Sequence, residues 1–336
     1  GKETVEEAVA RLQADPDIEY AEPNYTRALM AIPTNDTFRD QLWALDNVGQ
    51  TVNGAVSLSG ADMNVPQAWA ISEGQNASSP VIVAVIDSGV MYTHSDLSGA
   101  MWDGSSCVDE AGNPLGGCLH GYDFADDDRD PTPVYSPVSD AYKHGTAVSG
   151  VIAATKNNNT GVVGIAPKVR IMALRIGFDV DFTIASEVKA IDFAIANRAK
   201  VINASYGGST FSIAEQDAIN RFRAGGGLFV TSAGNSNSNN DLVPQYPASY
   251  TLDNIIAVAA TDQQDTRTSF SNDGIQSVDV SAPGKNIYST TTTISQTTVL
   301  SETFEGTNVT PPDVPTGWVK NGHWGTLRFA PGSTVL

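Results

Sequence analysis

Residues 81–89 read VIVAVIDSG. The first six of them are apolar and mostly β-branched, which is typical of a strand that is buried on both faces of a sheet. The same composition recurs in four later stretches, at 169–174, 200–205, 227–233 and 254–260. Each of these short apolar runs predicts another buried strand.

Helical patterns lie between the predicted strands. One covers residues 183–198, where an apolar stripe is made by Ile184, Val188, Ile191 and Ile195. A second runs from 213 to 222. Strands that alternate with helices predict an α/β fold, a doubly wound parallel sheet with helices on both faces. Ligand sites in such sheets lie beyond the carboxyl ends of the strands, so the residues at these ends are the candidates for function.

Composition and motifs argue against three classes of function. The chain has 336 residues, a hydrophobic fraction of 41% and a formal net charge of −19. Such acidity disfavours a nucleic-acid partner, because phosphates are bound by Lys and Arg. No run approaches the ~18 consecutive apolar residues of a membrane-spanning helix, so no membrane span is predicted. A nucleotide-binding protein is disfavoured too, since no glycine-rich phosphate loop joins a strand to a helix.

Three polar residues stand where predicted strands end or helices begin. Asp87 follows the first strand directly, His144 precedes Gly-Thr at the start of an apolar helix pattern, and Asn235 ends GLFVTSAGN. A carboxylate, an imidazole and a carboxamide can together move a proton and stabilise an oxyanion. Each residue alone also has an ordinary structural role, as a turn cap, a structural histidine or a left-handed turn asparagine.

Five segments in chain order carry a family resemblance: VAVIDSG, HGTAVSG, ASYGG, TSAGN and SAPG. They resemble the subtilisin-like serine proteases (subtilases), over residues 1 to about 290. The resemblance implies a serine endopeptidase that hydrolyses polypeptides. It implies that Asp87 orients His144, that His144 is the general base and then the general acid, and that Asn235 donates into the oxyanion hole.

The resemblance also assigns two substrate-binding segments. The first matches the family's strand that pairs with the substrate backbone, a mode of binding that tolerates many sequences; it consists of Ser205, Tyr206 and Gly207. The second matches one wall of the pocket for the side chain before the scissile bond; it consists of Ser232, Ala233 and Gly234.

Calcium is implied by the resemblance as a structural ion. Asp96 and the loop residues Asn157 and Asn158 match places where the family supplies oxygen ligands, which calcium prefers. The acidic run DFADDDRDP at 123–131 is either a second ion site or a solvated loop.

Three domains are expected along the chain. Residues 1–30 resemble the C-terminal part of the family's α+β propeptide, an intramolecular inhibitor. They combine a helical pattern with IEYAEPNY at 18–25, which predicts an edge strand that ends near its proline. Residues 31–295 are the expected catalytic domain, and 296–336 the start of a β-rich insertion or a C-terminal segment.

The family's nucleophile is not found in this sequence. It lies in a Gly-Thr-Ser-Met-Ala segment at the start of a buried helix, downstream of SAPG. The serines after SAPG lack both the preceding Gly-Thr and a helical pattern; they are Ser289, Ser295, Ser301 and Ser333. We therefore expect the nucleophilic serine beyond residue 336 and no turnover by these 336 residues alone. The alternative is a pseudoprotease that binds peptides without cutting them.

The two cysteines, Cys107 and Cys118, flank a loop rich in Gly, Pro and Asn. The spacing suits a disulfide and lacks the nearby ligands of a zinc site. Two free thiols are the alternative. A disulfide favours a secreted protein, whose signal peptide would lie outside these residues.

Overall fold

The computed structural model describes residues 3–23, 33–75, 79–136, 139–178 and 181–292. The chain divides into two compact units after Thr292, and all described residues belong to the first. The expected β-rich segment at 296–336 lies outside the described residues.

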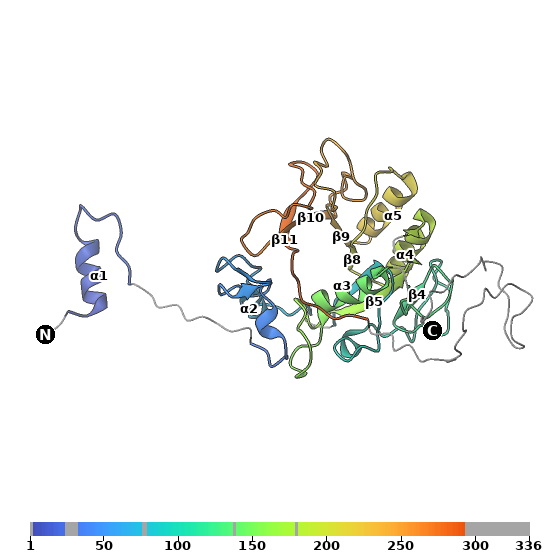
Figure 1. Ribbon diagram of the computed structural model, residues 1–336, viewed down its shortest axis with the longest axis horizontal. Coiled ribbons are helices and arrows are strands. Elements are labelled where there is room, and N and C mark those ends of the chain that lie inside the picture. The colour runs from blue at the N-terminus through green and yellow to red at the C-terminus, as the bar shows by residue number, and fades with distance from the viewer. Residues whose placement is uncertain (1–2, 24–32, 76–78, 137–138, 179–180, 293–336) are drawn as a thin grey trace, which may run out of the picture. The chain divides into compact units, whose positions relative to one another are not determined.

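A seven-stranded sheet forms the centre of residues 33–292 (Figure 1). Its order is β11-β10-β9-β8-β3-β5-β4, and every neighbouring pair is parallel. The bounds are β3 Ile82–Asp87, β4 Gly121–Asp123, β5 Arg170–Arg175, β8 Val201–Ala204, β9 Leu228–Ser232, β10 Ile255–Thr261 and β11 Val280–Pro283. All five predicted strands are present, and the parallel sheet is confirmed.

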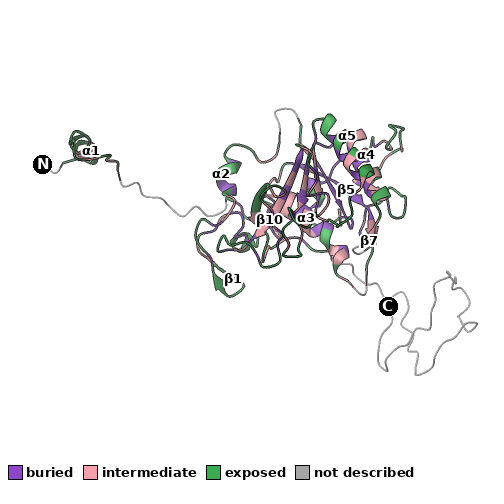
Figure 2. Cartoon of the chain, turned by 90° about the horizontal axis from the view of Figure 1, so that it is seen from above, coloured by how far each residue is buried: buried purple, intermediate pink, exposed green. Residues whose placement is uncertain are grey.

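Helices cover both faces of this sheet, as predicted. On one face, Ala84 and Ile86 of β3 pack in a core with Phe193 of α4 (Ile184–Ala196) and Phe222 of α5 (Ile213–Ala224). On the other, the alternate residues of β3 pack with α3 (His144–Ala153). Successive strand residues point to opposite faces, so a strand buried on both must be apolar throughout. Figure 2 shows the buried residues gathered along the strands.

Shorter elements complete this part of the chain. A five-residue helix, α2 (Val65–Trp69), follows a small hairpin of β1 (Thr51–Val52) and β2 (Ala55–Val56). A second hairpin joins β6 (Gly177–Phe178) to β7 (Asp181–Phe182) just before α4. Single turns of 3-10 helix lie at Arg39–Gln41, Ser98–Ala100 and Ala141–Lys143.

Residues 3–23 contain one helix, α1 (Val5–Gln13). A capping box begins it: Thr4 Oγ1 accepts from Glu7 N at 3.1 Å, and Glu7 Oε2 accepts from Thr4 N at 2.9 Å. The edge strand predicted at 18–25 is wrong for residues 18–23, which adopt no strand. An edge strand exists only where a second strand supplies its ladder, and these residues have none within the described chain.

The predicted disulfide is confirmed between Cys107 and Cys118. Asn197, at the end of α4, anchors the disulfide loop: its side chain accepts from Val108 N at 3.0 Å and donates to Val108 O at 2.9 Å. In the described part of the chain no helix combines the length and apolar character that crossing a bilayer requires.

Candidate active site

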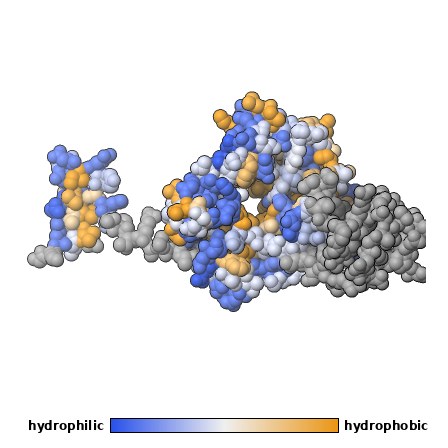
Figure 3. Space-filling model, viewed as in Figure 1, coloured by the Kyte–Doolittle hydropathy of each residue, from blue (hydrophilic) through white to orange (hydrophobic). Residues whose placement is uncertain are grey.

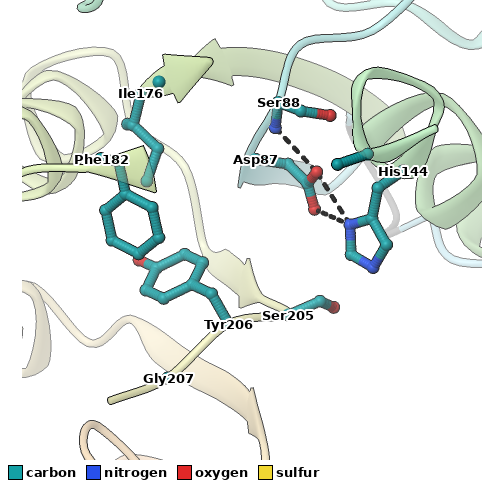
Figure 4. A pocket seen from close by; sticks show the side chains of 10 residues that line it. Asp87, Ser88, His144, Ile176, Phe182, Ser205, Tyr206 and Gly207 are labelled. Carbon is teal, nitrogen blue, oxygen red and sulfur yellow. Dashed lines mark hydrogen bonds and ion pairs between the residues drawn. The ribbon is translucent and has the colours of Figure 1, made fainter. Parts of the chain in front are cut away.

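Asp87 and His144, predicted at a strand end and a helix start, meet in the structure. Asp87 is the last residue of β3, and His144 is the first residue of α3. Nδ1 of His144 lies 2.9 Å from both Oδ1 and Oδ2 of Asp87 (Figure 4). The backbone N–H of Ser88 donates to Oδ1 at 2.7 Å. These bonds fix the carboxylate in the orientation that holds the imidazole.

Gly145 permits this close approach of α3 to β3. A Cβ at this position would lie 2.3 Å from the carbonyl oxygen of Gly89 and 3.1 Å from Oδ1 of Asp87. Two bonds join the turn after β3 to the start of α3: Gly145 N donates to Ser88 Oγ at 3.2 Å, and Met91 N donates to Thr146 Oγ1 at 3.0 Å. The sequence His144-Gly145-Thr146 therefore supplies the imidazole and also allows α3 to pack closely against β3.

The environment of His144 suits proton transfer. The hydrogen bond that His144 donates to Asp87 raises the pKa of His144; burial opposes this rise, and the negative charge of Asp87 adds to it. Asp87 engages Nδ1, whereas Nε2 points away from Asp87 (Figure 4) and has no hydrogen-bond partner among the described residues. Half of the His144 side chain, 50%, is exposed, against 5% for Asp87. An oriented imidazole with one free nitrogen can take up and release a proton.

A pocket of about 300 Å³ opens beside this pair. The predicted substrate strand lies along it, since Ser205, Tyr206 and Gly207 line the pocket together with His144. The rings of Phe182 and Tyr206 meet edge to face, with 4.8 Å between their centroids, and form its aromatic wall (Figure 4). Within the described chain, Tyr206 and Gly207 make no backbone hydrogen bond. Their N–H and C=O groups are therefore available to an added strand.

The segment after β9 carries the other predicted residues. Ser232 ends β9, Gly234 has φ +109°, and Asn235 is exposed. These three residues line a second, larger cavity that His144 also borders. The structure thus places Asn235 and His144 on one cavity. Ala233, by contrast, is fully buried.

Two buried asparagines that the sequence does not point to, Asn240 and Asn272, hold this segment. Asn240 Nδ2 donates to Ala233 O at 2.8 Å, and Asn272 N donates to Gly234 O at 2.8 Å. Asn272 Nδ2 in turn donates to Asn240 Oδ1 at 2.9 Å. A Cβ on Gly234 would lie 2.6 Å from Asn272 Nδ2, so glycine is required here. Isolated loop asparagines have no spacing signal, which is why only the structure reveals them.

Comparison with known proteins agrees with this geometry. The model of the subtilase family matches residues 78–313 of the chain. The chain belongs to the subtilase family.

Relatives of this subtilase include several named proteases. A thermophilic serine proteinase of Bacillus sp. (strain AK1) is 35% identical over 86% of this chain and 60% of its own length. Thermitase of Thermoactinomyces vulgaris is 36% identical over 75% of this chain and 77% of its own. The chain thus spans less than two thirds of the length of the Bacillus proteinase. Among solved structures, a protease from Pseudoalteromonas arctica PAMC 21717 matches with a TM-score of 0.59 and 26% identity, over 75% of this chain and 72% of that one.

The second cavity of this subtilase, about 600 Å³, has a mostly apolar lining. His144, Ser205 and Asn235 border it, and its lining includes Val148 and Ile152 of α3 with Val230 of β9 and Val258 of β10. In β9 and β10, fully buried residues alternate with half-buried ones, and Val230 and Val258 are half-buried. One apolar sheet face is therefore incompletely covered. In Figure 3 the molecule is hollowed near its centre, with apolar surface inside.

The predicted calcium ligands lie around a fourth residue, Asp36. Asp96 and Asp36 are 0% and 2% exposed. Asn158 joins them: its Nδ2 donates to Asp96 Oδ1 at 2.7 Å, and its backbone N–H donates to Asp36 Oδ1 at 3.0 Å. Asn157 donates to Asp36 through its backbone N–H, at 3.0 Å, while its side chain accepts from Asn35 N at 3.2 Å. Asp36 lies sixty residues before Asp96 in sequence, so only folding brings the two together.

Burial and charge act together on this cluster. Burial raises the pKa of Asp96; bonds from Val162 and Asn158 oppose the rise, the charge of Asp36 adds to it, and the charge of His94 opposes it. No Lys, Arg or His side chain of the described residues forms an ion pair with either carboxylate. Nor do three His, Cys, Asp or Glu side chains converge anywhere in the described chain. An ion here would need amide and backbone oxygens as well, which calcium accepts.

The acidic run at 123–131 is built differently. Asp123 and Asp126 pair with Arg175, which is 1% exposed, and Asp127 accepts a hydrogen bond from Tyr122 Oη at 3.1 Å. Part of the run therefore neutralises a buried arginine.

Proposed function

We propose that the protein containing this chain is a serine endopeptidase. The observation that carries the proposal is the Asp87–His144 pair, with Nδ1 held at 2.9 Å and Nε2 free at the edge of a pocket. In the proposed reaction, His144 Nε2 takes the proton of a serine hydroxyl as that oxygen attacks the substrate carbonyl. The same nitrogen then gives the proton to the leaving amine, and the serine ester is hydrolysed. Asp87 stabilises the imidazolium that forms in between.

Asn235 is the proposed oxyanion donor. Its exposed carboxamide borders the same cavity as His144, on a segment held by Asn240 and Asn272. A donor that is already in place when charge develops on the carbonyl oxygen is typically worth roughly 2.7–4 kcal/mol in the transition state. The substrate backbone would pair with the free groups of Tyr206 and Gly207. Ser232 and Gly234, which line the cavity, would wall the pocket for the side chain before the scissile bond, whereas Ala233 lies buried behind them.

We infer that the serine lies beyond residue 336, on a helix that fills the 600 Å³ cavity. The half-buried apolar faces of β9 and β10 support this inference, since a parallel sheet needs helices on both faces. The presence of His144 and Asn235 on the border of this cavity supports it too. A helix seated among Val148, Val230 and Val258 could place its first residues between His144 and Asn235.

Calcium is proposed as a structural ion held by Asp36, Asp96 and Asn158, with backbone oxygens completing its shell. The two buried carboxylates fit such an ion, because each lacks a cationic partner among the described residues. Its role would be to neutralise these charges and to tie the segment around Asp36 to the loop at 157–160.

Secretion is proposed from two observations. The Cys107–Cys118 disulfide suits an oxidising compartment. A halolysin-like relative of Natrialba magadii, 33% identical, is named an extracellular serine protease. The segment 1–30 is proposed as the end of an inhibitory propeptide.

The test compares two proteins, residues 1–336 and a longer product that continues past Leu336, on an unfolded casein substrate. We expect cleavage by the longer protein only, and its loss on His144→Ala. Turnover by residues 1–336 would contradict the placement of the serine. A continuation without a Gly-Thr-Ser segment, together with peptide binding but no cleavage, would support the pseudoprotease instead.

A further inference from the structure

Two glutamates that the proposed reaction does not use are buried between α4 and α5. Glu187 lies in the first turn of α4 and Glu215 in the first turn of α5, and they are 0% and 2% exposed. Tyr206 Oη donates to Glu187 Oε1 at 2.8 Å, and Tyr250 Oη donates to Glu215 Oε2 at 2.6 Å. Neither carboxyl group forms an ion pair with a Lys, Arg or His among the described residues.

One of these carboxyl groups must carry a proton. Two adjacent buried carboxylates without a cation cannot both be ionised. Burial raises the pKa of Glu187 well above its ordinary value; the charge of Glu215 and a hydrogen bond between the two carboxyl groups add to the rise, against the bond from Tyr206. Burial also raises the pKa of Glu215, while its bonds with Tyr250 and Glu187 oppose that rise. The two carboxyl groups therefore share one proton, and the larger rise favours its place on Glu187.

The charged groups around the pair do not neutralise it. Asp192 of α4 pairs with Arg221 of α5 at 2.7 Å, on the outer side of the same helix contact. Arg175, at the end of β5, pairs with Asp123. Asp87, at the end of β3, is negative itself and adds to the field at Tyr206.

Tyr206 connects the carboxyl pair to the groove. Its hydroxyl is bonded to Glu187, whereas its ring lies against Phe182 and lines the pocket that His144 borders (Figure 4). It also stands between Ser205 and Gly207 in the proposed substrate strand. The position of this strand thus depends on a hydrogen bond to a buried acid.

We propose that Glu187 and Glu215 form a carboxylic acid–carboxylate pair that holds Tyr206, and with it the substrate strand, in place for a bound peptide. Both glutamates are positioning residues, and their link to peptide binding rests on the proposed function. When Glu187 loses its proton, two negative charges face each other next to Tyr206. The wall of the groove then loses its fixed anchor, so peptide affinity falls as the pair ionises.

The first experiment tests the pair without any substrate, by the melting temperature of residues 1–336 across pH. The pKa of Glu187 is raised in the folded state, so its favourable contribution is complete below the ordinary value of 4.5 and is lost as pH rises through the folded value. Glu187→Gln keeps the shape and the donor of the protonated acid but needs no proton. We expect the melting temperature of E187Q to rise relative to the unmodified chain as pH increases.

The matched control is Asp192→Asn on the exposed side of α4, whose curve should run parallel to that of the unmodified chain. Parallel curves for Glu187→Gln as well would overturn the proposed pair. If Glu187→Gln does not fold, the peptide affinity of Tyr206→Phe is the deciding measurement, because this substitution removes only the hydroxyl group that is bonded to Glu187.

The second experiment measures the affinity of an acetylated tetra-alanine amide for residues 1–336 by calorimetry at pH 6 and pH 9. We expect affinity to fall at least about fivefold between these values, the lower end of usual coupling between sites. Glu187→Gln should bind the peptide at pH 6 as tightly as the unmodified chain does, and should lack the loss of affinity at pH 9 that ionisation of the pair causes. Tyr206→Phe should bind the peptide weakly at both pH values. The same fall in Glu187→Gln would overturn the positioning role. No binding by any variant would contradict the proposed function, and the melting curves would still decide on the pair.

Discussion

At the scale of single residues, the contact between β3 and α3 has almost no spare room. The chain turns after Asp87 through Ser88 and Gly89, and α3 begins directly against that turn. Burial of Asp87 makes its negative charge effective, and exposure of His144 leaves the imidazole accessible. The buried Asp87 thus stabilises the charge of the imidazolium, whereas the exposed His144 exchanges the proton.

His144 should titrate above its ordinary value of 6.5. The Asp87 hydrogen bond favours the imidazolium, so cleavage, which needs the neutral ring, should appear only as pH rises through this higher pKa. An NMR titration of the His144 ring in residues 1–336 measures it directly. Asp87→Asn should lower the pKa and cut the turnover of the longer protein by roughly 10⁴-fold. An unchanged pKa in Asp87→Asn would refute the role given to Asp87.

Gly145→Ala should destabilise the fold by about 1–3 kcal/mol, the usual cost of overpacking. The new methyl group would lie 2.3 Å from Gly89 O and push α3 away from β3. Urea unfolding measures the loss. Gly208→Ala is the matched control, since a Cβ there has no neighbour within 4 Å. Equal stability of the two variants would mean that the β3–α3 contact is looser than the structure describes.

At the scale of elements, the functional groups sit on the segments that follow the strands. Ser205 to Gly207 follow β8, and Ala233 to Asn235 follow β9. Neighbouring parallel strands end at the same edge of the sheet, so these segments lie next to each other and to Asp87. Hydrogen bonds from Asn240 and Asn272 hold the segment after β9, which suits a site that must keep its donors in place before the reaction.

Asn272→Ala should loosen the segment after β9. Its side chain accepts from Ser236 N at 2.8 Å and Ser238 N at 3.1 Å, and donates to Asn240 Oδ1 at 2.9 Å. Truncation therefore leaves the buried oxygen of Asn240 without its donor. The expected cost is about 1–3 kcal/mol for each unsatisfied buried group. Chemical unfolding checks the stability, and KM for a peptide substrate of the longer protein should rise. Asn113→Ala in an exposed turn is the control, and a similar loss there would argue against a special role for Asn272.

The Cys107–Cys118 bridge closes a loop that Asn197 ties to α4. Replacing both cysteines by serine should cost about 3 kcal/mol, the loop-closure value for a short ring. Thermal unfolding with and without reductant measures this. Reductant should shift the melting temperature of the unmodified chain and leave the double-serine variant unchanged. A shift in both would point to an effect of the reductant elsewhere.

At the scale of the whole molecule, long-range pairs decide how the parts fit together. Asp36 reaches Asn157 and Asn158, more than 120 positions away. Ser289 and Thr290 donate from their hydroxyls to Ala147 O and Thr146 O of α3, at 2.5 and 2.7 Å. The segments before and after the sheet are thereby attached to its loops and to α3.

Chelation of calcium should lower the melting temperature of residues 1–336. An ion that binds only the folded state stabilises it by mass action, about 2.7 kcal/mol at a hundredfold excess over Kd. Asp96→Asn should abolish the difference between calcium and chelator. Asp40→Asn, in which the replaced side chain is 82% exposed, is the control and should keep it. A calcium effect that survives in Asp96→Asn would remove the ion from this cluster.

Hydrophobic patterning by itself determined five of the seven strands of the sheet and the helices α4 and α5, because a strand buried on both faces must be apolar throughout. The two edge strands, β4 and β11, are short and gave no such pattern. The motifs at the strand ends identified Asp87, His144 and Asn235 as candidate site residues. Tertiary structure alone decided the rest. Asp36, Asn240, Asn272 and the Glu187–Glu215 pair depend on contacts between residues far apart in the chain, and lone polar residues carry no periodic signal. The absence of a strand at 18–23 has the same cause, since a strand depends on its partner as much as on its own residues.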